Sequence, residues 1–256
     1  MAANAAFPFL DWPGPIAFAH RGGASEVPEN TMPAFAHAVG LGYRYIETDV
    51  HATADGELVA FHDDRLDRVT DGSGVIAELP WSVVREALVD GREPIPRLED
   101  LLTTWPDLRI NIDPKHDAAV EPLAEILLRA NAVDRVCVGA FSDKRIARMR
   151  QLVGDALCTS MGPRQVARLV ASATRFATGR GLAAPCAQVP PSQGPVPLVT
   201  ERLVEAAHRR GIQVHVWTID DAGEMSRLLD LGVDGIMTDR PQLLKDLLME
   251  RGEWHG

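Results

Sequence analysis

Residues 16–50, IAFAHRGGASEVPENTMPAFAHAVGLGYRYIETDV, contain the pattern that decides the fold. Ile16–Ala19 is a short apolar run typical of a buried strand, and Tyr45–Val50 is a second one. Between them, Thr31–Leu41 has the apolar spacing of a helix, with Asn30 as its expected N-cap. A strand, a helix and a strand in this order predict a βαβ unit with parallel strands and a right-handed crossover.

The same alternation continues along the rest of the chain. Later strand candidates are Leu108–Asp113, Arg135–Ala140, Ala156–Thr159, Cys186–Val189, Val214–Thr218 and Gly235–Thr238. Helical patterns occupy Ala118–Ala130, Asp143–Leu152, Glu201–Arg210, Asp221–Leu231 and Pro241–Glu250. Repeated units of this kind predict an α/β fold. Our first interpretation is a (β/α)8 TIM barrel, and a doubly wound open sheet is the runner-up.

Residues 53–96 interrupt this rhythm with several turn signals and one helical piece around Trp81–Leu88. Leu58–His62 follows the Asp55-Gly56 turn and brings the strand candidates to nine, one more than a barrel uses. We interpret it as an excursion strand outside the barrel. Ala156–Thr159 and Cys186–Val189 are the least secure of the others. The stretch is interpreted as a small insertion, too short for a core of its own, in a single domain spanning residues 1–256.

Composition indicates an ordinary globular chain of 256 residues with 46% hydrophobic content. Acidic residues outnumber basic ones by 36 to 26, and the net charge of −10 argues against nucleic acid as a partner. No apolar run approaches the roughly 20 residues that span a bilayer. Because residues 1–15 lack the basic and apolar regions of a secretory signal, we expect a cytoplasmic protein without integral membrane contact. The oligomeric state stays open.

The chain has three cysteines, Cys137, Cys158 and Cys186, and no two of them form a CxxC pair. Each lies in an apolar stretch. This pattern predicts buried, reduced thiols and argues against both a disulfide framework and a zinc cluster.

Polar residues gather where the predicted strands end. Glu47 and Asp49 are two residues apart, so their side chains leave the same face of the strand. In a (β/α)8 barrel, side chains at the carboxyl ends of the strands point into the catalytic mouth. The residues that follow or end a predicted strand are His20, Arg21, Glu47, Asp49, His62, Asp63, Asp113 and Lys115. Residues 185–197, with five prolines, are interpreted as a loop at the active site or the rim.

These residue types together favour phosphoryl chemistry. Several carboxylates share a site at neutral pH only when a cation compensates their charge, and oxygen ligands suit Mg2+ or Ca2+. Arg21 and Lys115 add positive charge for a phosphodiester. Two histidines with an ordinary pKa of about 6.5 can act as general base and general acid. Taken alone, either histidine is as readily structural, and Trp217 at a strand end is often only a core residue.

The motifs His20-Arg21-Gly22, Glu29-Asn30-Thr31, Glu47-Thr48-Asp49 and His62-Asp63 resemble the signature of glycerophosphodiester phosphodiesterases. Val216-Trp217-Thr218, residues 232–236 (GVDGI) and residues 238–241 (TDRP) also resemble it, so the likeness spans nearly the whole chain. It implies a TIM barrel with a small insertion. It also implies a metal-dependent hydrolase of lipid and glycerol metabolism that releases glycerol 3-phosphate and an alcohol from a small phosphodiester.

Carried over residue by residue, the resemblance implies that His20 and His62 are the catalytic pair. It implies that Glu47, Asp49 and Asp113 bind the divalent metal, and that the substrate is bound by Arg21, Lys115 and Trp217. The family usually has Glu at the third ligand position, whereas this chain has Asp113, which is one methylene shorter and precedes Pro114. Asp239-Arg240 is expected to form a structural ion pair or a helix start before Pro241.

Two alternatives stay open on the sequence alone. A lysophospholipase D would use the same polar residues and needs an exposed apolar rim for an acyl chain, and the insertion is only mildly apolar. A barrel that binds a phosphorylated metabolite without turning it over would need neither histidine of the pair His20 and His62.

Overall fold

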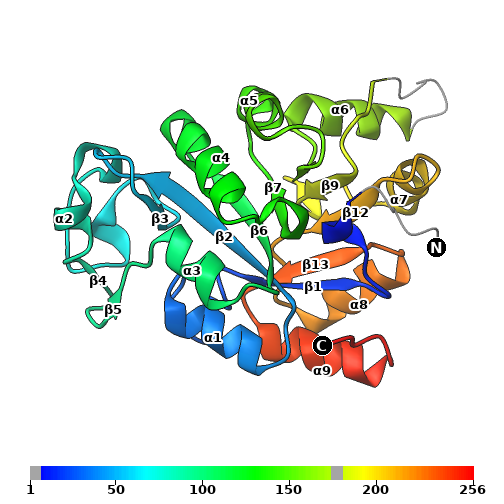
Figure 1. Cartoon of the computed structure of the whole chain (residues 1–256). Helices are drawn as coiled ribbons and strands as arrows, with labels where there is room; N and C mark the ends of the chain where they lie inside the picture. The colour runs from blue at the N-terminus through cyan, green and yellow to red at the C-terminus, as the bar shows by residue number, and fades with distance from the viewer. Residues whose placement is uncertain (1–6, 174–180) are drawn as a thin grey trace.

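The computed structural model describes residues 7–173 and 181–256. Within these ranges, eight parallel strands follow the order β8–β7–β6–β2–β1–β13–β12–β9, and a parallel bridge between Ser160 and Cys186 joins its two ends. The TIM-barrel prediction is therefore confirmed over the doubly wound open sheet (Figure 1). The strands are β1 Ile16–His20, β2 Tyr45–Ala52, β6 Arg109–Pro114, β7 Val136–Val138, β8 Cys158–Thr159, β9 Cys186–Val189, β12 Gln213–Val216 and β13 Gly235–Thr238.

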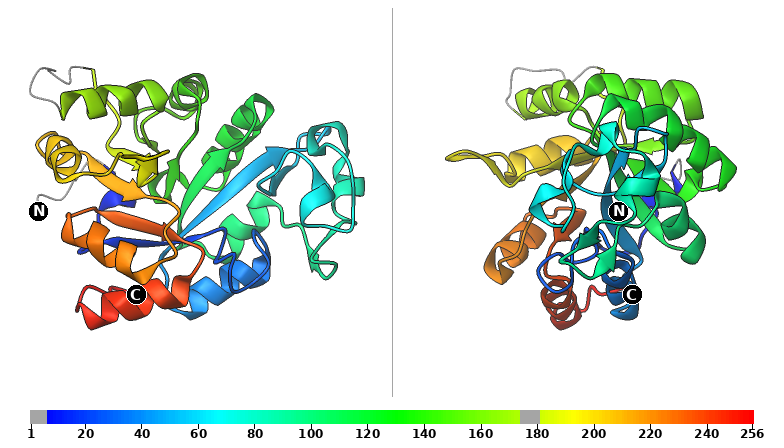
Figure 2. Two further views of the ribbon diagram at one scale, coloured as in Figure 1. Left: turned by 180° about the vertical axis from the view of Figure 1, so that it is seen from behind. Right: turned by 90° about the vertical axis from the view of Figure 1, so that its left-hand side faces the viewer.

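Helices surround the strands, as the views in Figure 1 and Figure 2 show. They are α1 Met32–Gly40, α3 Leu98–Thr104, α4 Val120–Arg129, α5 Asp143–Val153, α6 Pro163–Ser172, α7 Glu201–His208, α8 Ala222–Asp230 and α9 Pro241–Glu250. Six of them match the predicted helical stretches to within a few residues. Helices α3 and α6 were not predicted from the sequence.

The strands called least secure both belong to the barrel. Ala156–Thr159 corresponds to β8 and Cys186–Val189 to β9, so both of these strand predictions are confirmed. The ninth candidate is β3, Leu58–Ala60, which pairs antiparallel with the end of β2 and lies off the barrel order. Its interpretation as an excursion strand is confirmed.

The insertion projects from the carboxyl end of β2 (Figure 1). Besides β3 it contains 3-10 turns at Leu66–Arg68 and Ile76–Glu78, the short helix α2 Trp81–Val84, and the strand pair β4 Leu88–Val89 and β5 Glu93–Pro94. The expectation that it lacks its own core is wrong. A separate buried cluster is formed by Val59, Phe61, Leu66, Ile76, Val84, Ala87, Val89 and Ile95.

The barrel has two apolar layers. The larger one lies between the strands and the surrounding helices and includes Ile46, Ile110 and Leu123. The smaller one fills the barrel interior, where Phe18 and Tyr45 meet Phe9 from an N-terminal 3-10 turn, Pro8–Leu10. The interior of a barrel of this size is a packed core, so the residues of a site are expected at the carboxyl ends of the strands.

Helix α1 begins differently from the expectation. The N-cap is Thr31, whose side-chain oxygen accepts a hydrogen bond from the Ala34 backbone N–H. The residue expected in that role, Asn30, has a positive φ of 55° and turns its buried side chain toward β2. There its Oδ1 accepts a hydrogen bond from Thr48, and its Nδ2 donates to Asp49. Asn30 therefore supports the end of β2 instead of capping the helix.

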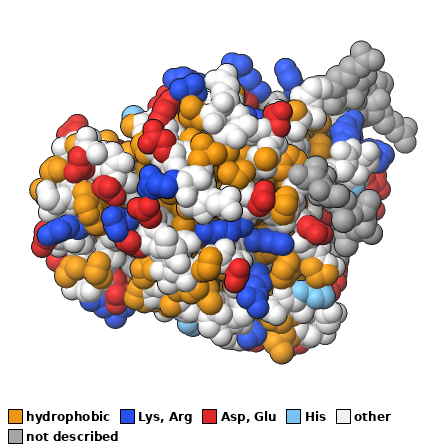
Figure 3. All heavy atoms as spheres, in the orientation of Figure 1, with side chains coloured by type: hydrophobic (Ala, Val, Ile, Leu, Met, Phe, Trp, Pro, Cys, Tyr) orange, Lys and Arg blue, Asp and Glu red, His pale blue; other side chains and the backbone are white. Residues whose placement is uncertain are grey.

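The proline-rich stretch at residues 185–197 contains β9 and a small hairpin of β10 Ser192–Gln193 and β11 Val196–Pro197. Charged side chains of both signs are interspersed on the face that Figure 3 shows. Of the helices in the described ranges, none combines the length and the apolar character that crossing a lipid bilayer requires. The three cysteines are free and buried, as predicted.

We propose that residues 1–256 form one domain, because β3 contributes Val59 to the insertion cluster while it pairs with barrel strand β2. Urea unfolding followed by circular dichroism and by tryptophan fluorescence should then give coincident transitions. Trp81 lies in the insertion and serves as its local probe, with Trp81→Phe as the control. An earlier fluorescence transition that disappears in Trp81→Phe would show that the insertion unfolds separately.

Candidate active site

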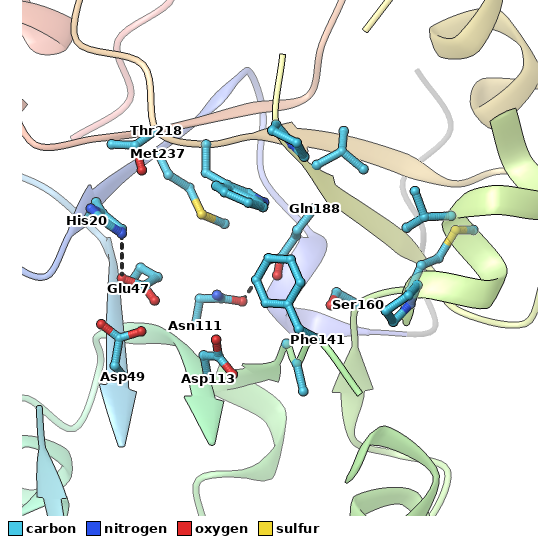
Figure 4. Close-up of a pocket in the computed structure, with 18 of the residues that line it drawn as sticks. His20, Glu47, Asp49, Asn111, Asp113, Phe141, Ser160, Gln188, Thr218 and Met237 are labelled. Atoms are coloured by element: carbon cyan, nitrogen blue, oxygen red, sulfur yellow. Dashed lines mark hydrogen bonds and ion pairs between the residues drawn. The ribbon is translucent and has the colours of Figure 1, made fainter. Parts of the chain in front are cut away.

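A pocket of about 690 Å³ opens at the carboxyl ends of the barrel strands. Figure 4 shows it with acidic and imidazole side chains on one side and aromatic and apolar ones on the other. The eight residues to which the family resemblance assigned a role all line this pocket: His20, Arg21, Glu47, Asp49, His62, Asp113, Lys115 and Trp217. Residues separated by almost 200 positions in the chain are thus brought to one place.

Strand register explains how the acidic group forms. Glu47 and Asp49 lie on one face of β2, where Glu47 pairs with His20 of β1 and Asp49 pairs with Asp113 of β6. Residues paired across parallel strands point to the same side of the sheet. Asn111, two residues before Asp113, pairs with Glu47 and adds an amide beside it. The inward face of three adjacent strands therefore carries the histidine and all three carboxylates.

The His20 ring is held on both sides by carboxylates. Its Nδ1 lies 2.6 Å from Asp239 Oδ1, and its Nε2 lies 3.7 Å from Glu47 Oε2. Burial acts to lower the pKa of His20, but Glu47 and Asp239 outweigh it, so the pKa is raised. Asp239 itself is anchored by its backbone N–H, which donates to Asp220 Oδ1 at 2.8 Å.

Asp239 is a residue of the site that the sequence analysis did not assign. It was expected to pair with Arg240 or to begin a helix. The helix does begin there, with Arg240 as N-cap of α9, but the Asp239 side chain contacts His20 instead. The two residues are 219 positions apart, and they meet because β1 and β13 are neighbours in the barrel. A contact of this kind is not predictable from local sequence patterns.

His62 also has a carboxylate on its Nδ1, at 2.6 Å from Asp63 Oδ1. The guanidinium of Arg68 holds Asp63, and this hydrogen bond lowers the pKa of Asp63 to about 2. Arg68 also contacts Glu29 at 2.7 Å, and Glu29 contacts Arg21. A chain of ion pairs thus links the support of His62 to the first strand. In both histidines a carboxylate engages Nδ1, whereas Nε2 of His20 makes a longer contact, 3.7 Å, with Glu47.

The positively charged side chains near the three carboxylates compensate only part of their negative charge. Lys115 Nζ lies 2.7 Å from Asp49 and 3.0 Å from Asp113, and Arg21 Nε lies 3.1 Å from Asp49. Burial acts to raise the pKa of Asp49, but Lys115 and Arg21 outweigh it and the pKa is lowered. By contrast, burial and the charge of Asp49 raise the pKa of Glu47 to about 7.

The negative charge of Asp113 is also incompletely compensated. Burial raises its pKa, and its Oδ1 is buried without a hydrogen-bond partner. An acidic group in this state fits a hard cation that accepts oxygen ligands. Glu47, Asp49 and Asp113 are the residues that could hold it. Arg21 and Lys115, expected to contact phosphate, lie at the pocket and are engaged with these carboxylates in the described structure.

The opposite wall of the pocket is apolar, and the sequence analysis foresaw only Trp217 of it. Phe141 is 69% exposed and packs edge to face on Trp217, with ring centroids 5.4 Å apart. Helix α6, which was not predicted, contributes Val166 and Val170. Further apolar side chains that line this wall are Met161, Ala167, Val189, Pro190 and Leu198. The loop at residues 185–197 therefore does reach the pocket, as predicted.

Comparison with known proteins places this geometry in context. Residues 20–243 match the profile of the Glycerophosphoryl diester phosphodiesterase family. The chain is 44% identical to a probable glycerophosphodiester phosphodiesterase 2 of Mycobacterium tuberculosis, over 97% of this chain and 96% of that protein. It is 28% identical to a human lysophospholipase D, over 90% of this chain and 84% of the human protein.

Solved structures support the fold. A putative glycerophosphoryl diester phosphodiesterase from Silicibacter pomeroyi superposes with a TM-score of 0.82 at 22% identity, covering 97% of this chain and all of the other. A phosphodiesterase of Oleispira antarctica, solved in complex with the product sn-glycerol-3-phosphate, superposes with a TM-score of 0.76 at 21% identity. That match covers 92% of this chain and 97% of the other.

Proposed function

The chain belongs to the glycerophosphoryl diester phosphodiesterase family, and we propose that it hydrolyses glycerophosphodiesters with His20 and His62 as acid/base pair. The products are glycerol 3-phosphate and an alcohol. Family membership makes the chain a phosphoric diester hydrolase, so the non-catalytic barrel considered from the sequence is set aside. The observation that carries the residue assignment is the matched support of the two imidazoles, each with a carboxylate 2.6 Å from Nδ1.

This support has a chemical consequence. A carboxylate that accepts from Nδ1–H orients the ring, fixes which nitrogen faces the pocket and stabilises the imidazolium. Nε2 of one histidine then takes the proton of the attacking oxygen, and Nε2 of the other donates a proton to the departing alkoxide. Both rings line the same pocket, as this exchange across phosphorus requires. Asp239 and Asp63 act as positioning residues.

The second part of the proposal concerns a metal ion at the acidic group. We expect Glu47, Asp49 and Asp113 to hold a divalent cation, Mg2+ or Ca2+, because the unpartnered Asp113 Oδ1 and the high pKa of Glu47 both signal missing positive charge. When bound, such an ion neutralises the phosphodiester and the charge that develops on it. Arg21 and Lys115 lie on either side of Asp49 and orient it. Trp217 contributes a flat apolar surface for the alcohol portion.

Replacement of His20 or His62 by Ala should lower kcat for glycerophosphocholine by about 10²–10⁴-fold, the range that general acid/base catalysis contributes. His37→Ala is the matched control, because His37 pairs with Glu26 and does not line the pocket. Release of glycerol 3-phosphate measures the rate. A loss below about tenfold in either variant would show that the assignment of that histidine is wrong.

Divalent ions should raise the unfolding temperature of chelator-treated protein in a concentration-dependent way, because binding adds about 2.7 kcal/mol to the free energy of unfolding at a hundred times Kd. Chelator should also abolish turnover, and Mg2+ or Ca2+ should restore it. Glu47→Gln removes a ligand and should remove the thermal shift. Glu86→Gln, at an exposed position in the insertion, is the control that should retain it. A shift that survives in Glu47→Gln would place the ion elsewhere.

The apolar wall favours a second candidate substrate class, a lysophospholipid. Such a substrate shares the glycerophosphodiester core and adds an acyl chain that needs an apolar surface. From the sequence, such a surface was sought in the insertion. The candidate surface that supports this proposal is instead the apolar wall of α6 and Phe141, beside the polar residues of the same pocket. A lysophospholipase D activity would therefore use the same catalytic groups with a longer contact surface.

Val166→Glu places a charge on this wall and should lower kcat/KM for lysophosphatidylcholine by about tenfold or more, since each buried methylene contributes about 0.8 kcal/mol. Glycerophosphocholine lacks the acyl chain and should be much less affected. Val83→Glu, on the exposed side of the insertion helix, is the control. Equal losses for both substrates would argue that the wall does not bind an acyl chain.

A further inference from the structure

The three cysteines of the chain converge inside the barrel. Cys137, Cys158 and Cys186 come from the neighbouring strands β7, β8 and β9, and their Sγ atoms all lie within 4.8 Å of one another. The Cys137 and Cys186 sulfurs are 3.9 Å apart. All three side chains are buried and reduced. They belong to the apolar cluster of the barrel interior, together with Phe18 and Tyr45.

None of the three thiols lines the active-site pocket. Each cysteine precedes a pocket-lining residue by two positions: Gly139, Ser160 and Gln188, respectively. Residues two apart on a strand share one face and are separated by about 6.5–7 Å along it. Gln188 donates a hydrogen bond to Asn111 at 2.8 Å, and both line the pocket, so this pair forms part of the floor. The thiols are therefore distinct from the carboxylate site.

The spacing of the sulfurs matches a metal–thiolate site. With metal–sulfur bonds of about 2.3 Å, ligand sulfurs are separated by about 3.8 Å in a tetrahedral site and about 4.0 Å in a planar three-coordinate one. The observed separations of 3.9 Å and at most 4.8 Å require only small side-chain rotations to reach these values. Thiolates select soft ions such as Zn2+ and Cu+ over the hard ions that carboxylates prefer.

The surroundings also contain an unpartnered nitrogen. His215 is fully buried on β12, the strand next to β9, and its Nδ1 has no hydrogen-bond partner. Its ring packs on Phe18, a member of the same interior cluster as the thiols. Burial lowers the pKa of His215, which keeps the imidazole neutral, and a neutral imidazole is the form that can ligate a metal.

We propose that Cys137, Cys158 and Cys186 form a second metal site, which binds one thiophilic d10 ion such as Zn2+ or Cu+ inside the barrel. As each sulfur–metal bond forms, the corresponding S–H bond breaks and its proton passes to solvent, so no oxidant or reductant takes part. The absence of a CxxC pair argued against a zinc cluster in the sequence. The barrel revises that expectation, because each ligand comes from a different strand.

Cd2+ is the probe for this site, because its bonds to thiolate give an ultraviolet charge-transfer band. It is added at one equivalent to the reduced full-length protein, with excess Mg2+ to occupy the carboxylates. Because the thiols are buried, a parallel sample is refolded from urea with the same ions. We expect one Cd2+ per chain and the charge-transfer band in at least one of the two samples. Glu47→Gln, which damages only the carboxylate site, should keep both the bound Cd2+ and the band.

Cys186→Ser and Cys137→Ser should each lose the band and lower the Cd2+ retained after gel filtration by at least about tenfold. Two single substitutions at different strands keep the test valid if one variant fails to fold. The proposal is overturned if wild type shows no band in either arm, or if the band persists in a folded serine variant. It is equally overturned if intact mass and thiol counts show that two of the cysteines form a disulfide in the purified protein.

Discussion

The register between β1, β2 and β6 is the constraint on which the site depends. It pairs His20 with Glu47 and Asp49 with Asp113, so the inward face of three adjacent strands carries an imidazole and three carboxylates. A register shift by one residue would turn these side chains to the helix layer and bring apolar residues such as Ile46 into the mouth. The large apolar layer between strands and helices therefore helps to fix the position of the polar residues at the mouth.

The same register creates an electrostatic cost that the rest of the mouth offsets only in part. Arg21 and Lys115 compensate Asp49, and they leave Glu47 with a raised pKa and Asp113 with an unpartnered oxygen. A fold that keeps such an arrangement stabilises it through contacts elsewhere. Here the ion pairs from Arg21 through Glu29 to Arg68 tie the mouth to the insertion. The insertion, which contains Arg68, thus supports His62 through Asp63.

Periodicity made much of this predictable. The two-residue spacing of Glu47 and Asp49, and of Asp113 and Lys115, is a property of extended chain, and the barrel follows from repeated strand and helix patterns. Asp239 was not assignable, because its contact with His20 exists only once β13 closes against β1. The apolar wall was missed with helix α6, and Asn30 failed as a cap because its side chain has better partners on β2.

The cysteines also show that spacing in the sequence does not reveal which residues the fold brings together. Pattern analysis treats cysteines as a possible site when they are close in sequence, since short spacings bring ligands together without help from the fold. A parallel barrel removes that requirement, because one inward residue from each of several strands meets at a single depth. Carboxylates that line the pocket and thiols that lie two residues before pocket-lining positions then form two chemically different groups in one barrel. Hard and soft ligands kept at different depths do not compete for the same ion.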